Sequence, residues 1–198
     1  MNKIVFPALC IVIMSLGCGT KTSPEQGIAT VPLPSFFPVT SFLQGEINKF
    51  DNMPVIPLKT IRYNGKTDSL WIKAGDIKAF AQPFLTPLID STNMLAFYNE
   101  NSFMDQSINF VTLTYSLKQG ISDPALHLRN WDVYIDPEKQ TVQRVYMVKE
   151  EQLNGKMQTI QLTWKTGNWC KIVSIPEGSN NVNDVKEETI TWNFSDNQ

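Results

Sequence analysis

The sequence contains little histidine and little cysteine, and these shortages exclude common kinds of catalytic site. His127 is the only histidine, and the three cysteines are Cys10, Cys18 and Cys170. Ser-His-Asp and Cys-His catalysis needs an imidazole base, so His127 alone would have to serve. A zinc site needs three or four His, Cys or carboxylate ligands, and the chain lacks the nitrogen and sulfur ligands for one. We therefore expect no metal and no cofactor.

The sequence also lacks an excess of positive charge. It has 17 Lys and Arg against 19 Asp and Glu, for a net charge of −2. Binding of nucleic acid depends on phosphate neutralisation by Lys and Arg, so no nucleic-acid partner is expected. A glycine-rich motif that could hold phosphates is also missing.

No apolar run in the sequence is long enough to form a membrane-spanning helix. The longest run, from Ile4 to Met14, is much shorter than the roughly 20 residues that a span requires. It follows Lys3 and ends in a short stretch of small residues, which is the layout of a secretory signal. An ordinary buried helix is the alternative, but neither a helix-start motif nor an amphipathic stripe supports it.

The end of this segment, Ser15-Leu16-Gly17-Cys18, resembles the cleavage and acylation site of a bacterial lipoprotein. Gly17 and Cys18 fit the usual pattern, whereas Ser15 and Leu16 stand in the reverse of the usual order. We expect cleavage before Cys18 and lipid on its thiol; the alternative is an ordinary secretory signal and a free Cys18. The predicted organisation is a signal peptide over 1–17, acylated Cys18 with a flexible tether over 18–37, and a single domain over 38–198.

Within the domain, the pattern predicts an α+β fold. Apolar residues recur at helical spacing over 39–50, and a second apolar stripe over 76–88 is interrupted by Pro83 and Pro87. Asn64-Gly65 joins two extended runs, which is typical of a β-hairpin. Residues 90–106 are mixed and loop-like, and the chain after residue 107 is rich in alternating strand patterns. We expect an antiparallel meander of about six to eight strands, covered on one face by two or three helices.

Carboxylates are the only abundant acid–base groups. Asp132 and Asp136 lie on one predicted strand, and a glycan hydrolase would need two such carboxyl groups facing each other across a cleft. Asp136 precedes a proline, as turn residues do. Solvated turn carboxylates are the simpler interpretation, so we expect no enzyme.

The five tryptophans divide into two groups. Trp131, Trp164 and Trp192 lie on the apolar phase of their strands and are expected in the core. Trp71 and Trp169 are less clearly placed, and we take them as candidate ligand contacts, where exposed rings could stack on a sugar or line an apolar groove. Cys170 is expected to be a buried, inert thiol.

Several segments together resemble uncharacterised cell-envelope lipoproteins of the Bacteroidota type. They are Ser15–Cys18, the tether, the run Tyr98–Asp105 with the Thr-rich strand after it, and Trp131–Lys149. The resemblance implies a cell-envelope location and provides no catalytic residue to transfer.

These observations favour a lipid-anchored, non-enzymatic envelope protein that binds a partner protein or an apolar ligand. One alternative is a lipid or lipoprotein carrier with an open half-barrel, and another is an envelope glycan hydrolase with paired carboxylates. The expected partners are the membrane, through the N-terminal lipid, and an envelope protein or glycan. Because Gly19-Thr20-Lys21 lacks an acidic run, we expect an outer-membrane anchor that faces the periplasm.

Overall fold

The computed structural model describes residues 36–121, 127–153, 155–179 and 182–195, all within one compact unit, Pro34–Gln198. The predicted signal peptide, the acylation site at Cys18 and most of the tether lie outside the described residues. Within the described ranges, no helix has both the length and the apolar character that crossing a membrane requires.

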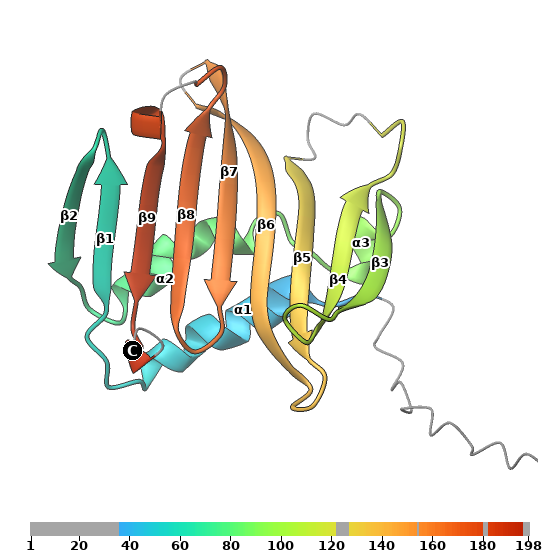
Figure 1. The fold of residues 1–198 in the computed structure, drawn as a ribbon, viewed down its shortest axis with the longest axis horizontal. Coiled ribbons are helices and arrows are strands. Elements are labelled where there is room, and N and C mark those ends of the chain that lie inside the picture. Colours follow the sequence, from blue (N-terminus) through green and yellow to red (C-terminus); the bar gives the residue numbers. More distant parts are fainter. Residues whose placement is uncertain (1–35, 122–126, 154, 180–181, 196–198) are drawn as a thin grey trace, which may run out of the picture. The chain divides into compact units, whose positions relative to one another are not determined.

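The described chain is organised around one antiparallel sheet of nine strands (Figure 1). The spatial order is β2-β1-β9-β8-β7-β6-β5-β4-β3. Strands β3 to β9 therefore form a meander, and the β1–β2 hairpin extends it because β1 pairs with β9. The strands are β1 (Leu58–Tyr63), β2 (Lys66–Trp71), β3 (Tyr98–Asp105), β4 (Phe110–Leu117), β5 (Leu128–Asp136), β6 (Thr141–Leu153), β7 (Lys156–Lys165), β8 (Trp169–Pro176) and β9 (Lys186–Thr191).

The predicted α+β class, with two or three covering helices, is wrong. The fold is nearly all β, because α1 (Val39–Asn48) is the only α-helix in the described residues longer than five residues. The 3-10 turn η1 (Lys49–Asp51) extends it. The strand count also exceeds the predicted six to eight.

The missing helix has a clear physical cause. The stripe over 76–88 gives only α2 (Asp76–Phe80) and the 3-10 turn η2 (Gln82–Leu85). Proline removes a helix donor and its ring clashes with the preceding turn, so Pro83 and Pro87 end regular helix here. Two further short elements are α3 (Ser91–Met94) and the 3-10 turn η3 (Val182–Asp184).

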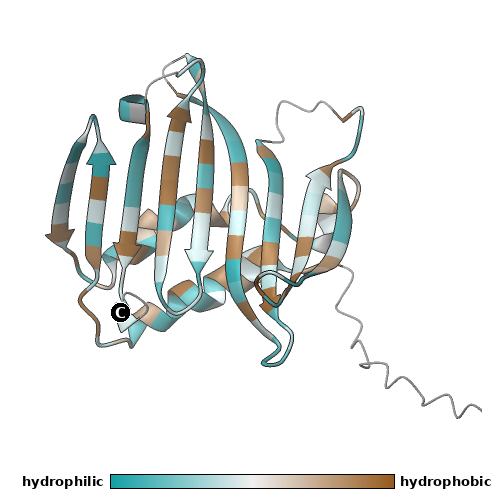
Figure 2. Cartoon of the chain, in the orientation of Figure 1, coloured by the Kyte–Doolittle hydropathy of each residue, from teal (hydrophilic) through white to brown (hydrophobic). Residues whose placement is uncertain are grey.

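One face of the sheet carries the core and lies against α1 and α2 (Figure 1). Among the described residues no helix covers the other face, which we call the helix-free face. Apolar and polar residues alternate along the strands (Figure 2), as expected where one face is packed and the other meets solvent. Trp131 and Trp164 are fully buried and Trp192 is 6% exposed. The prediction that these three rings form part of the core is confirmed.

Two polar contacts hold the segment after α2 against the rest of the core. The backbone N–H of Ile89 donates to the buried hydroxyl oxygen of Thr40 in α1 at 2.8 Å. The ammonium of Lys149, which is 1% exposed on β6, donates to the carbonyl oxygens of Pro83 and Thr86. Buried polar groups are costly unless they are paired, so these contacts specify how the segment packs.

Candidate binding site

The β1–β2 hairpin forms one edge of the sheet. Its turn residues Asn64 and Gly65 have φ angles of 52° and 70°, which suit a two-residue hairpin turn. Strand β2 pairs with β1 on one side and is last in the strand order. All six of its residues are exposed. The sequence prediction of this hairpin is therefore correct, and its outer strand offers unpaired backbone groups.

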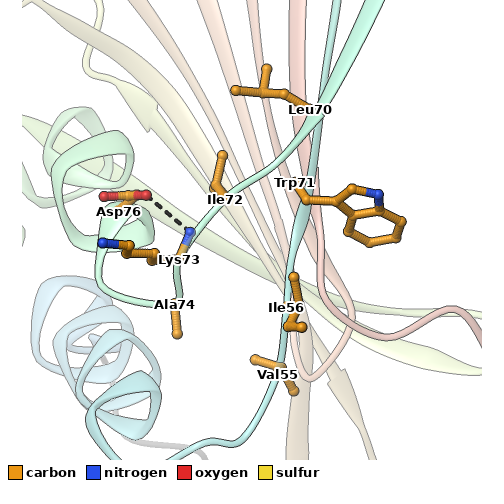
Figure 3. Close-up of a pocket in the computed structure, with 8 residues that line it drawn as sticks. All are labelled: Val55, Ile56, Leu70, Trp71, Ile72, Lys73, Ala74 and Asp76. Carbon is orange, nitrogen blue, oxygen red and sulfur yellow. Dashed lines mark hydrogen bonds between the residues drawn. The ribbon is translucent and has the colours of Figure 1, made fainter.

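An open cleft of about 610 Å³ lies where β2 ends. Its apolar wall includes Ile56, Leu70 and Trp71, whose side chains are 71%, 48% and 63% exposed. Figure 3 shows the Trp71 ring projecting away from the helical side, whereas Lys73 and Asp76 lie toward it. The lining residues, which we call the edge cleft, are Val55, Ile56, Leu70, Trp71, Ile72, Lys73, Ala74 and Asp76.

Backbone contacts fix the walls of the edge cleft. The N–H of Ile72 donates to the carbonyl oxygen of Pro57 at 2.9 Å, and the N–H of Lys73 donates to the Asp76 carboxylate at 3.0 Å (Figure 3). The Trp71 ring also meets the ring of Phe194 edge-on, with centroids 6.1 Å apart. The cleft is therefore built from two segments, 55–56 and 70–76, and Phe194 contacts Trp71 from near the other end of the chain.

The second predicted contact, Trp169, lies on the helix-free face and not in the edge cleft. It is half-buried at the start of β8, and the Lys171 ammonium lies 5.6 Å from its ring centroid. The register places Trp71 opposite Leu58, Leu58 opposite Thr191, and Thr191 opposite Trp169. Three strand spacings of about 4.8 Å separate the two rings along this row, so they do not form one stacked pair.

The structure does not bring Asp132 and Asp136 together as a facing pair. They are four residues apart along β5, or about 13 Å in an extended strand. The Asp136 carboxylate accepts N–H groups from Lys139 and Glu138, and these bonds lower its pKa. Burial raises the pKa of Asp132, against the opposing effect of a Thr114 hydrogen bond. Asp136 is thus a turn residue, and the described neighbours of Asp132 on the helix-free face are Thr114, Arg144 and Tyr134.

The remaining acid–base candidates are dispersed. His127 is exposed, with Nδ1 3.1 Å from the carbonyl oxygen of Glu150. Cys170 is a buried free thiol, and burial raises its pKa. Across the described part of the chain, no three His, Cys, Asp or Glu side chains gather closely enough to hold a metal ion.

Sequence reasoning found Trp71 but missed the other walls of the edge cleft. Ile56 lies in a segment without periodicity. The sequence pattern predicted Phe194 on one side of a last strand with Ile190 and Trp192, but β9 ends at Thr191 and Phe194 is 42% exposed, where its ring contacts Trp71. The pair Leu70-Trp71 could have indicated an exposed apolar side chain. Two large apolar residues in succession lie on opposite faces of a strand, so one of them points away from a core on a single face.

Comparisons with protein-family models, curated proteins and solved structures gave no match to this chain. The functional proposal therefore rests on the residues and their geometry.

Proposed function

We propose that this chain is a lipid-anchored, non-enzymatic protein of the cell envelope that binds an apolar, extended segment of a partner protein at the edge cleft. The observation that carries this proposal is a group of exposed apolar side chains beside a free strand edge: Ile56 and Trp71 line the edge cleft and the Trp71 ring contacts Phe194, all three being at least 42% exposed. Exposed apolar side chains that gather in one place mark interaction sites more often than scattered ones do.

A partner segment can use two features of this edge. Unpaired backbone groups of β2 can accept an added strand, in which main-chain hydrogen bonds supply affinity and pockets for alternate side chains supply specificity. The edge cleft at the end of β2 supplies such a pocket. Trp71 adds a large ring with an indole N–H, a combination that is enriched at binding hot spots.

The position of the cleft also suits an anchored protein. The described chain begins at Phe36, whose ring packs against Tyr115 of β4 and Trp131 of β5, with centroids 5.1 and 5.9 Å apart. Strand β2 is at the opposite edge, six strand spacings from β5, or about 30 Å. A tether attached at Phe36 would leave the β2 edge open to a partner.

The packing of the core favours surface binding over lipid carriage. Core side chains fill the space between the sheet and the helices, and Trp131, Trp164, Tyr115 and Phe84 are among the largest fully buried ones. A carrier would need that space for its cargo.

The test measures binding of the full chain to an array of extended decapeptides. In these peptides Val, Ile, Leu or Phe alternate with Thr. Trp71→Ser should weaken binding of the retained peptides at least about tenfold, as expected for loss of a hot-spot residue. Phe103→Ser is the matched control, because Phe103 is 51% exposed on the opposite edge strand β3. An array without retained peptides, or equal losses in both variants, would refute the proposal.

A further inference from the structure

A second exposed apolar group lies at the other edge of the sheet, where β3 is the last strand (Figure 1). Strands β3 and β4 form a hairpin whose last pair before the turn is Asp105 and Phe110. Phe103, Met104 and Ile108 are 51%, 49% and 40% exposed. All three lie within two residues of this last pair. We call this group of three side chains, at the closed end of the hairpin, the hairpin tip.

The hairpin offers apolar contact and no positive charge. Neither lysine nor arginine occurs from Tyr98 to Leu117, and the charged residues there are Glu100 and Asp105. The Asp105 carboxylate accepts hydrogen bonds from the backbone N–H and the hydroxyl of Ser107, at 2.9 and 2.5 Å. An acidic ligand finds no cation on this hairpin. Burial of apolar side chains is therefore the interaction by which the tip can hold a partner.

The first described residue packs close to this edge of the sheet. The Phe36 ring lies against Tyr115 of β4 and Trp131 of β5, and β4 is the strand next to β3. With lipid on Cys18, the segment 19–35 would hold Phe36 within about 60 Å of the bilayer, the length of a fully extended chain. A further contact with that bilayer is then effectively intramolecular, so a small apolar group can suffice.

We propose that the hairpin tip docks on the lipid bilayer that holds the anchor, with the β3 edge toward the membrane. This inference rests on the anchored protein of the proposed function and adds a membrane contact made by the domain itself. The three side chains enter the boundary between headgroups and acyl chains, where they leave water. Deeper entry is excluded, because the unpaired backbone groups of an edge strand are too costly in the hydrocarbon core.

The distribution of side chains on β3 favours a lipid surface over a partner strand. A strand added along β3 would run past residues 99–102, which are Asn, Glu, Asn and Ser, before it reached the tip. Phe103 and Met104 are successive residues, so they point to opposite faces of the sheet. A fluid lipid surface can surround side chains on both faces of an edge, whereas an added strand pairs only with the backbone between them.

The test is fluorescence quenching of the mature, acylated chain in phosphatidylcholine vesicles whose acyl chains carry nitroxide groups. A bimane label is attached at position 104 in Met104→Cys or at position 157 in Met157→Cys. Met157 is the matched control, because it is 36% exposed at the start of the central strand β7. Labelling is selective, since Cys170 is buried and Cys18 would carry the lipid.

The label at position 104 should be quenched, and the label at position 157 should not. Phe103→Ser and, separately, Ile108→Ser should each lower the ratio of docked to undocked chains about fivefold, because each removes a partly exposed apolar side chain from the contact. Leu153→Ser should leave the ratio unchanged, since Leu153 is 57% exposed at the far end of β6. Added phosphatidylglycerol should not strengthen the quenching, because the hairpin has no cation to attract anionic lipid.

Two outcomes would overturn the inference while the anchor stands. One is equal quenching at the two positions, or quenching at position 104 that both tip variants leave intact. The other is stronger quenching with phosphatidylglycerol, which would show that charge and not apolar burial holds the domain. A chain that does not float with the vesicles would overturn the anchor and the inference together. Far-ultraviolet circular dichroism of each variant distinguishes a lost contact from a lost fold.

Discussion

Lys149 is the residue at which charge and packing are most closely linked. Its ammonium lies on the core side of β6 and donates hydrogen bonds to the carbonyl oxygens of Pro83 and Thr86. Burial lowers its pKa to about 8, and Glu151 opposes this effect. The folded chain therefore gives up this proton at a lower pH than the unfolded chain, whose lysine pKa is about 10.4.

This difference predicts that Lys149 makes stability rise with pH between about 8 and 10.4. In that window the unfolded state binds more protons, so raising the pH favours the folded state. Relative to Lys149→Met, the parent chain should gain about 1–3 kcal/mol in free energy of unfolding from pH 7 to pH 10. Urea unfolding of both chains at both pH values measures the difference, and an identical pH dependence would contradict the account.

The positions of individual tryptophans could be predicted from the sequence only where a strand pattern surrounds them. Trp131, Trp164 and Trp192 were correctly placed because strict alternation fixes the face of a strand on which a residue lies. Trp71 was predicted as a candidate ligand contact, but its surroundings could not be predicted because they depend on Ile56 and Phe194. Contacts between distant segments leave no local periodicity, so the edge cleft was not predictable as a site.

At the scale of elements, the sequence predicted the hairpin well and the helices poorly. Asn64-Gly65 favours its turn through backbone geometry alone. In the stripe over 76–88, Pro83 and Pro87 prevent a regular helix. Strand β3 was missed because a polar edge strand has no buried face to impose alternation; seven of its eight residues lie outside the core. The pairing of β1 with β9 joins distant parts of the chain and could not be predicted from local pattern.

The hairpin turn gives a prediction about the edge that carries the cleft. Gly65 has φ of +70°, which costs a residue with a side chain about 1 kcal/mol. Gly65→Ala should therefore lower the free energy of unfolding by about that amount. Gly75→Ala is the control, because Gly75 has φ of −63° and nothing lies within 4 Å of the added carbon. Urea unfolding of the two variants tests this, and equal effects would show that the turn geometry is unimportant.

At the scale of the whole molecule, the proposed function requires export and anchoring. The native protein should lack residues 1–17 and carry fatty acid on Cys18. Intact-protein mass spectrometry of material extracted from its own membrane measures both features. A Cys18→Ser variant should be released from the membrane fraction, whereas Cys170→Ser should stay there, because Cys170 is buried in the domain. Retention of both variants would contradict the anchor.

We propose that the anchor and the edge cleft work in one arrangement. Phe36, the first described residue, packs beside β4 and β5, and the cleft lies at the β2 edge, beyond β1. A tether attached at Phe36 would leave the β2 edge accessible for an added strand.

Photo-crosslinking in the cell that makes the protein tests the central claim most directly. A photoreactive amino acid at position 70, on the free edge strand, should give one discrete adduct with a partner protein, and Trp71→Ser should abolish it. The control is the same amino acid at position 153, because Leu70 and Leu153 are similarly exposed, at 48% and 57%. Absence of a discrete adduct at position 70, or the same adduct at position 153, would contradict binding at the edge cleft.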